Sequence, residues 1–410
     1  MPRRLHVYAD PELGAYGYEE KAWYLPGARL EAFLDEARAR GLTEAIDFVS
    51  AGPATDAQLQ SFHTAAYVAS VVSRCAKDEG SLDGAVAPIV QDAVRLLMAV
   101  SDAANAQGAA SVSVVRAQLA ATLAPAMSFD TYMDYLGAEQ LLVHDATAGT
   151  IRLGAGAEAF LGSANPRLTG PTLARVGVER AARWICGAAL DATRRILAGD
   201  HERVFIPIAG FHHAHAAEAR MYCLYNDPVL AIRHALGQLS GTVAYIDIDI
   251  HQGDGVYEAF AEEPRVVVAD LHEDASTLFP YTPEQPGEQH FPGGREDRGR
   301  GAGAGTKLNI ALAAQTTDAE YLALWAEAEA FVRASKPEFI VFESGVDGLG
   351  SDPLSNQSLT TKAFDEVTRR VCALADESAG GRLLVLGGGG YELEGTKQGW
   401  CAVVEALLAS

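Results

Sequence analysis

Short apolar runs alternate with helical segments from residue 203 to the end of the chain. The apolar runs are RVFIPIAG (203–210), TVAYIDID (242–249), RVVVADLH (265–272), EFIVFESG (338–345) and RLLVLGGGG (382–390). Segments of helical periodicity lie between them, such as those at 318–335 and 361–378. Strands this apolar are buried on both faces, and parallel strands need a crossover between them. The pattern therefore predicts an α/β fold, in which helices cover both faces of a mainly parallel sheet.

Local signals predict two further helices. The amphipathic segment 27–42 is expected to form one of them near the N-terminus. The other follows the first apolar run and begins in the sequence NDP. Asp227 is expected to be its N-cap and Pro228 its first helical residue, because an aspartate cap before a proline is a typical helix start.

Polar side chains gather at the carboxyl ends of the predicted strands, which is where ligands bind in such sheets. The positions are His212 and His213 after the first strand, Asp249 and His251 at the end of the second, Asp347 after the fourth, and Tyr391 after the run Gly387–Gly390. Along a strand, side chains alternate between faces, so Asp247, Asp249 and His251 are expected on one side. The topology predicts that these distant positions converge.

Asp249, His251 and Asp347 have the chemistry of a three-ligand site for zinc or a similar divalent ion. Alone, the Asp-x-Asp pattern would favour an ordinary structural role, in which Asp247 and Asp249 cap loops or pair with arginines. The tandem histidines, the glycine run and the second aspartate at a strand end favour the metal site.

The tandem pair His212 and His213 suits proton transfer near neutral pH. Each imidazole needs an acceptor for its other nitrogen, and Asp247 and Asp254 are available. His215 and His234 have no evident partner in the sequence and are expected to be structural. The hydroxyl of Tyr391, presented after four glycines, is expected to donate to an oxyanion.

Charge and cysteine content limit the setting. The 54 acidic and 32 basic residues give a formal charge of −22, which argues against binding nucleic acid or anionic membranes and is compatible with a cationic substrate. The five cysteines form no CxxC pair, which suits a reducing compartment. No signal peptide and no membrane span is evident, so we expect a cytoplasmic protein.

Several blocks, taken in order, resemble the histone deacetylase family and its bacterial acetoin-utilisation and acetylpolyamine-amidohydrolase relatives. They are GFHHAHAAEARMYCLYND (210–227), YIDIDIHQGDGVYEAF (245–260), LHEDASTLFP (271–280), SGVDGLGSDPLSNQSLT (344–360) and LGGGGYEL (386–393). The N-terminal half is similar only through residues 54–71 and Arg29. The resemblance implies one catalytic domain over residues 1–410, with a family-atypical insertion around 85–160. It implies an arginase-like α/β/α fold around a sheet of about eight strands.

The resemblance also implies roles for individual residues. Asp249, His251 and Asp347 would hold Zn²⁺, or alternatively Fe²⁺, and His213, paired with Asp254, would be general base and then acid. His212, paired with Asp247, would assist electrostatically, and Tyr391 would polarise the carbonyl. A structural K⁺ would lie near Asp247 and the backbone oxygens of Asp249, His251 and Leu271. Met221, Tyr222, Phe279 and Gly389 would line the acyl tunnel.

The chain departs from the family pattern around that tunnel. Met221–Tyr222 replaces the usual Gly-Phe, FPYTP (279–283) replaces FPGTG, and Gln252 stands where many members have a second histidine. A methionine in place of glycine removes backbone freedom and adds bulk.

We expect a zinc-dependent amidohydrolase that removes an acetyl or other acyl group from an acylated amine, such as acetyl-lysine or an acetylpolyamine. One alternative is a catalytically weak homologue that binds metal or acyl ligands through a remodelled entrance. Another is a dimanganese ureohydrolase-like enzyme, for which the additional aspartate ligands are not evident. Whether the chain forms a homo-oligomer stays open.

Overall fold

The computed structural model of the chain divides into two compact units. The first comprises residues 1–70, 177–219 and 223–410, and the second comprises residues 71–176 and 220–222. The structure describes residues 4–15, 26–75, 96, 99–100, 103–104, 109–119, 133, 142–154, 177–275, 277–278 and 293–410. The expectation of a single domain with an insertion around 85–160 stays a prediction, since much of that segment lies outside the described residues.

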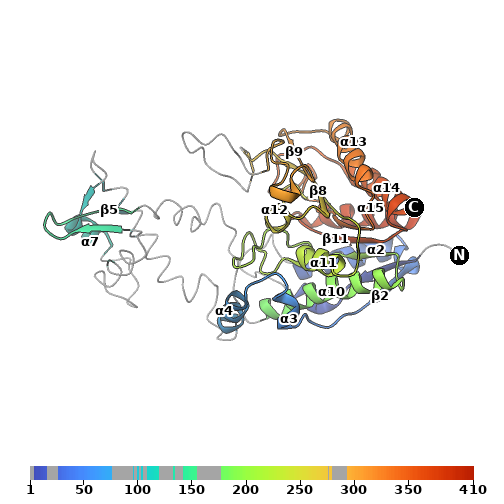
Figure 1. Ribbon diagram of the computed structural model, residues 1–410, viewed down its shortest axis with the longest axis horizontal. Helices are drawn as coiled ribbons and strands as arrows, with labels where there is room; N and C mark the ends of the chain where they lie inside the picture. The colour runs from blue at the N-terminus through green and yellow to red at the C-terminus, as the bar shows by residue number, and fades with distance from the viewer. Residues whose placement is uncertain are drawn as a thin grey trace. The chain divides into compact units, whose positions relative to one another are not determined.

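An eight-stranded, fully parallel sheet forms the centre of the first unit, in the order β2-β1-β6-β11-β10-β7-β8-β9 (Figure 1). The strands are β1 (Leu5–Tyr8), β2 (Ile46–Val49), β6 (Arg203–Ile206), β7 (Val243–Asp247), β8 (Val266–Glu273), β9 (Lys307–Leu312), β10 (Phe339–Glu343) and β11 (Leu383–Leu386). Every residue of β6, β7, β8, β10 and β11 is buried. The predicted sheet is therefore confirmed, as is the α/β fold class.

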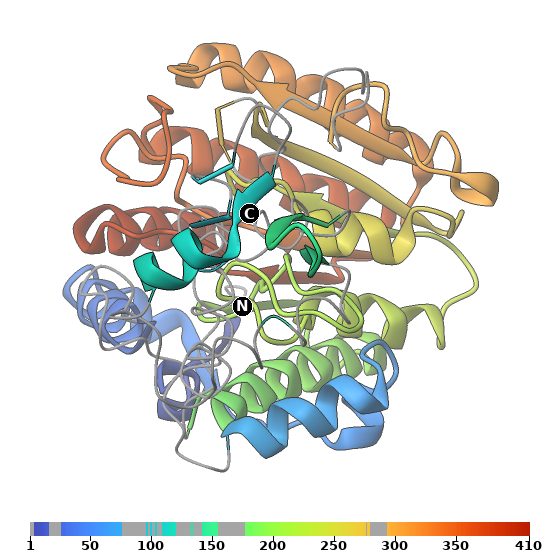
Figure 2. The same ribbon diagram turned by 90° about the vertical axis from the view of Figure 1, so that its left-hand side faces the viewer.

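Helices cover the sheet in two layers (Figure 2). In one layer α2 packs on α15, α15 on α14 and α14 on α13, and in the other α1 packs on α10, α10 on α11 and α11 on α12. Their bounds are α1 (Pro11–Gly14), α2 (Pro26–Ala39), α10 (Val178–Ala198), α11 (Asp227–Leu236), α12 (Asp254–Phe260), α13 (Asp318–Ser335), α14 (Thr361–Ser378) and α15 (Leu393–Ala409). The further elements are η1 (Leu42–Ala45), α3 (Asp56–Leu59), α4 (Ala65–Cys75) and η2 (Gly301–Gly303). None of the described helices has the length and apolarity required to cross a membrane.

The start of α11 differs from the prediction by one residue. Asn226 is the N-cap, because its side-chain oxygen accepts from the Val229 N–H at 3.0 Å. Asp227 is instead the first helical residue. Its carboxylate accepts the backbone N–H groups of Gly210 and Phe211 at 2.9 and 2.8 Å. The aspartate is therefore used to hold the loop that leads to the tandem histidines.

The second unit contains a small antiparallel sheet in the order β3-β5-β4. Its elements are β3 (Ala109–Ser111), β4 (Leu142–Asp145), β5 (Thr150–Leu153) and the helix α7 (Val112–Leu119). Ala110 and Ile151 pair across β3 and β5 and are both buried, so this sheet has an apolar side of its own.

A buried histidine supports the start of α11. His63 is 1% exposed, and its Nε2 accepts the backbone N–H of Asn226 at 3.0 Å. The side chain of Asn226 then donates to the carbonyl oxygens of His212 and Ala214. Burial lowers the pKa of His63 from 6.5 to about 4.

Because the unfolded chain binds a proton at His63 that the folded chain excludes, we expect stability to fall as the pH falls from about 6.5 to about 4. The full shift corresponds to about 3 kcal/mol. In His63→Gln, whose amide oxygen can accept the same N–H, this part of the loss should be absent. Urea unfolding of both proteins across that pH range measures the difference, and parallel curves would contradict the prediction.

Candidate active site

The predicted metal ligands lie beyond the carboxyl ends of two adjacent strands. Asp249 and His251 follow β7, and Asp347 follows β10, which pairs with β7 in the sheet. One potential ligand atom from each lies within 4.8 Å of the others, and all three residues are buried. No other group of this kind is found among the described residues. The three residues singled out in the sequence are therefore close enough to share one ion, and their role as metal ligands stays a prediction.

The donor set fits a divalent cation. His251 Nδ1 lies 2.9 Å from Asp347 Oδ2 and 3.2 Å from Asp249 Oδ1, so both carboxylates converge on one nitrogen. Burial opposes a charge on His251, but Asp249 and Asp347 outweigh it and raise its pKa to about 10. Burial raises the pKa of Asp347 to about 7. Two oxygen donors and one imidazole nitrogen suit zinc or iron(II), and a cation there would stabilise both carboxylates.

Backbone N–H groups fix the two carboxylates in place. Asp347 Oδ1 accepts from Ile250 at 2.9 Å, and Asp249 Oδ1 accepts from His251 at 2.9 Å. Asp249 Oδ2 accepts from Gly389 at 2.7 Å. Hydrogen bonds from the backbone thus hold the two carboxylates in place without the help of an ion.

The tandem histidines form the two predicted His–Asp pairs. His212 Nδ1 lies 2.9 Å from Asp247 Oδ2, and His213 Nδ1 lies 2.7 Å from Asp254 Oδ1. The two Nε2 atoms are 3.1 Å apart. At that distance one ring must be able to donate a proton to the other, so the pair acts as one unit.

The two imidazoles have opposite electrostatic environments. Burial opposes a charge on His212, but Asp247 and Asp249 outweigh it and raise its pKa to about 9. Burial, together with the charge of His212, lowers the pKa of His213 to about 3. His212 is therefore the charged member at neutral pH, and His213 is the neutral member that can accept a proton.

Tyr391 lies on the loop that follows β11. Its ring stands edge-on to His251, with the centroids 6.3 Å apart, and its backbone N–H donates to Asp352 Oδ2 at 2.6 Å. A side chain at Gly389 would place its Cβ 2.2 Å from Asp347 Oδ2 and 2.6 Å from Asp249 Oδ2. Only glycine allows this close approach of the loop to the metal ligands. Whether Gly389 also contacts substrate stays a prediction.

Several contributors were missed from sequence. Asp352 anchors Tyr391, and Tyr245 donates from its hydroxyl to Asp247 Oδ2 at 2.7 Å. His215, expected to be structural, lies 3.3 Å from Asp254 Oδ2, a partner that was not evident in the sequence. His234 likewise lies 2.7 Å from the amide nitrogen of Gln238. Asp352 and Tyr245 had a signal, since each lies within five residues of a predicted site aspartate.

The region expected to bind potassium is buried and acidic. Asp247 Oδ1 accepts the Asp249 N–H at 3.0 Å, and Asp270 lies opposite Asp247 in the register of β7 and β8. Burial raises the pKa of Asp247 to about 7, partly opposed by His212, and Asp270 adds to the rise. Asp270 also contacts His272 Nδ1 at 2.7 Å. Potassium near Asp247 and Leu271 stays a prediction.

The predicted tunnel residues are not tested. Phe279 lies outside the described residues, and Met221 and Tyr222 belong to the second unit. The latter two have left-handed backbone, with φ of 44° and 67°. This conformation is one that glycine adopts readily, and here two larger residues adopt it.

The chain is similar to several known proteins. The acetoin utilization protein AcuC of Bacillus subtilis (strain 168) is 33% identical over 218 residues, which cover 53% of this chain and 54% of that protein. The putative histone deacetylase 2 of Caenorhabditis elegans is 34% identical over 225 residues, covering 54% of this chain and 41% of that protein. The chain thus spans about half the length of the curated relatives that it matches.

Two solved structures show the same fold. The crystal structure of the HDA15 HD domain has a TM-score of 0.67 at 20% identity, covering 99% of this chain and 90% of that chain. An HDAC homologue complexed with SAHA has a TM-score of 0.66 at 22% identity, covering 100% of this chain and 84% of that chain. The family model of the histone deacetylase domain matches residues 25–407. The chain therefore belongs to the histone deacetylase family.

Proposed function

We propose that this chain is a zinc- or iron(II)-dependent amidohydrolase that removes an acetyl or other short acyl group from an acylated amine in the cytoplasm. One observation carries the proposal. A buried cluster of two carboxylates and one imidazole lies beside a neutral histidine, a charged histidine and a tyrosine, in a member of the histone deacetylase family. These are the parts needed for metal-assisted amide hydrolysis.

The residues divide the chemistry between them. A divalent metal held by Asp249, His251 and Asp347 would acidify a water molecule and polarise the acyl carbonyl. His213 takes a proton from the water as its oxygen attacks the acyl carbon. The Tyr391 hydroxyl donates to the carbonyl oxygen as negative charge develops there. His213 then gives its proton to the nitrogen, the C–N bond breaks, and a carboxylic acid and a free amine leave.

His212 is a positioning residue in this scheme. Its charge, retained by Asp247, keeps His213 in the neutral form that a general base requires. Asp254 holds the His213 ring through Nδ1, so the proton is received at Nε2, the atom that also faces His212 Nε2 at 3.1 Å.

The negative charge of the chain favours a cationic amine substrate, but it does not distinguish an acetyl-lysine protein from an acetylated polyamine. The formal charge of −22 attracts cations such as an acetyl-lysine segment or an acetylated polyamine. A two-metal ureohydrolase is disfavoured because the described residues contain only one three-ligand cluster. A pure binding protein would not require the proton-transfer pair.

The first test is metal dependence. We expect the purified chain to hold one zinc or iron(II) ion, to lose deacetylation of acetyl-lysine peptides or acetylpolyamines on chelation, and to regain it with metal. Asp347→Asn should lower both metal content and turnover, because it removes a charge from the ligand set. Asp365→Asn, on the surface of α14 beside Arg369, is the control. Full turnover in the chelated protein would contradict the proposal.

The second test separates the proton carrier from the oxyanion donor. We expect His213→Ala to lower kcat by about 100-fold or more, and Tyr391→Phe by about 100- to 1,000-fold. Both should retain metal, because neither is a ligand, and His234→Ala should retain activity. Metal analysis and acetate release measure these effects. A Tyr391→Phe variant that turns over at the full rate would remove the tyrosine from the mechanism.

Asp352 is expected to act through Tyr391 rather than on the substrate. Asp352→Asn should lower kcat by about tenfold or more with little change in KM, because the tyrosine loop loses its carboxylate anchor. Combined with Tyr391→Phe, the loss should stay close to that of Tyr391→Phe alone. Additive losses in this double-mutant cycle would show that Asp352 acts independently of the tyrosine.

A further inference from the structure

A pocket lies in the first unit, lined by residues other than those of the candidate metal cluster. Its volume is about 440 Å³, within the range of roughly 300–1,000 Å³ typical of small-molecule sites. The loop after β2 (Ser50–Pro53), Gln58 of α3, the middle of α10 and His234 of α11 line it. None of these residues belongs to the metal centre or to its hydrogen-bond partners.

Hydrogen bonds and a close backbone approach hold the loop after β2 against α10. The loop after β2 is tied to α10, since the Ala54 N–H donates to the Arg183 carbonyl at 2.8 Å and Arg183 Nη1 donates to the Ala54 carbonyl at 3.1 Å. Gly187 permits the approach, because a Cβ there would lie 1.9 Å from the Gly52 carbonyl oxygen. The cavity is therefore preformed, which limits the cost of ordering it around a ligand.

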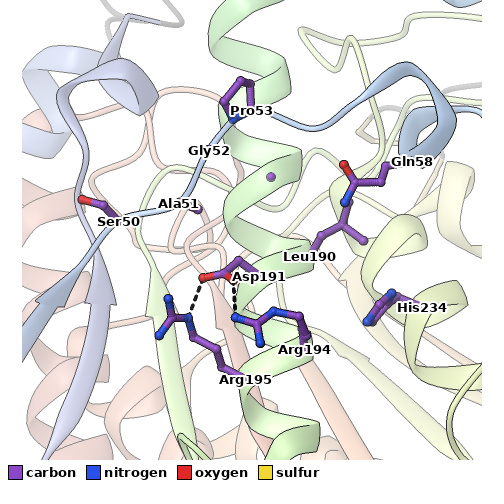
Figure 3. Close-up of a pocket in the computed structure, with 11 residues that line it drawn as sticks. Ser50, Ala51, Gly52, Pro53, Gln58, Leu190, Asp191, Arg194, Arg195 and His234 are labelled. Carbon is purple, nitrogen blue, oxygen red and sulfur yellow. Dashed lines mark hydrogen bonds and ion pairs between the residues drawn. The ribbon is translucent and has the colours of Figure 1, made fainter.

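Two arginines that line the pocket, Arg194 and Arg195, both contact the carboxylate of Asp191. Arg194 Nη2 lies 2.8 Å from Asp191 Oδ1, and Arg195 Nε lies 2.7 Å from Asp191 Oδ2. Tyr8 also donates to Asp191 Oδ2, at 2.7 Å. Figure 3 shows the two guanidinium groups on either side of Asp191, with the loop Ala51–Pro53 above them. Asp191 thus orients both arginines through one carboxylate.

These arginines retain donors for a ligand. Within the described part of the chain, Arg195 Nη1 and Nη2, and Arg194 Nε and Nη1, have no hydrogen-bond partner. Their side chains are 34% and 52% exposed. Two positive groups against one carboxylate leave the pocket lining with a formal charge of +1. The nearby Asp10 is satisfied by Ser50 and Ala51 and does not line the pocket.

We propose that this pocket binds a small organic molecule through a single oxyanion, a phosphate or a carboxylate, held by Arg194 and Arg195. A guanidinium fork matches the geometry of either group. Leu190 and Pro53 supply apolar surface for a short carbon skeleton. Because the chain as a whole is strongly acidic, long-range attraction cannot supply the affinity, so it depends on these direct contacts.

The test is calorimetric titration of the full chain at constant ionic strength. The probes are inorganic phosphate, glycerol 3-phosphate and butyrate, with the wild type beside Arg194→Gln, Arg195→Gln and Arg38→Gln. Arg38 is an exposed arginine of α2 paired with Asp35, and it serves as the matched control. Thermal unfolding checks that each variant is folded. Arg194→Gln leaves the contacts of Asp191 with Arg195 and Tyr8 in place, so it remains informative if Arg195→Gln does not fold.

We expect saturable binding at one site per chain, weakened about tenfold or more in each folded variant at Arg194 or Arg195 and unchanged in Arg38→Gln. The probe bound most tightly then distinguishes phosphate from carboxylate. If binding is unchanged in the Arg194 and Arg195 variants, the probe binds elsewhere, for example at the metal centre, and the proposal is overturned. The absence of saturable binding for all three probes also overturns it. Neither result depends on deacetylase activity.

Discussion

The structure depends on burying several carboxylates at the ends of adjacent parallel strands. Asp247, Asp249 and Asp347 follow or end β7 and β10 and are almost wholly removed from solvent. An isolated carboxylate in such surroundings is costly, so each one needs donors or a cation. The local chain supplies them as backbone N–H groups and imidazoles. A bound metal would complete this compensation, which is why the site and the fold are not separable.

The same interactions link the metal ligands to the tyrosine loop. Asp249 accepts the N–H of Gly389, and two residues further on Asp352 accepts the N–H of Tyr391. The loop is therefore held at two points, by the candidate metal ligand Asp249 and by Asp352, which is not part of the metal cluster. Its glycines are required because the backbone at Gly389 passes within side-chain distance of Asp249 and Asp347. The position of Tyr391, the proposed oxyanion donor, is thus coupled to the geometry of the candidate metal cluster.

The sequence predicts those parts of the fold and of the candidate site that have a local sequence pattern. The apolar runs from 203 to 390 marked five strands of the sheet, and polar residues at their ends marked the candidate metal cluster and both His–Asp pairs. The strands β1, β2 and β9 were not anticipated, because four to six residues such as LHVY or IDFV carry little periodicity. Asp352 and Tyr245 were missed because their partners, a backbone N–H and a carboxylate, are determined by tertiary contact. The N-cap of α11 was misplaced because Asp227 serves the neighbouring loop instead.

Glu343 is a buried carboxyl group that, in the part of the fold that the structure describes, lacks the hydrogen-bond donors found at the aspartates of the site. It ends β10, it is fully buried, and among the described residues neither carboxylate oxygen has a hydrogen-bond partner. Burial, with the neighbouring aspartates, raises the pKa of Glu343 well above its ordinary value. Protonating an ordinary glutamate at pH 7 costs about 3–4 kcal/mol, which is less than leaving a bare ion unpaired in the interior.

Burial therefore favours the neutral form of Glu343, and two loops pass close to its carboxyl group. A Cβ at Gly210 or Gly388 would lie 2.2 or 2.1 Å from its carboxyl oxygens. Gly210 leads to the tandem histidines and Gly388 leads to Tyr391. Both loops are consequently packed against one buried carboxyl group, and both have φ in the left-handed region at that point, 94° and 62°. The tandem histidines and Tyr391, for which we propose acid–base and oxyanion roles, thus share a single buried support, and glycine is the residue that each loop requires there.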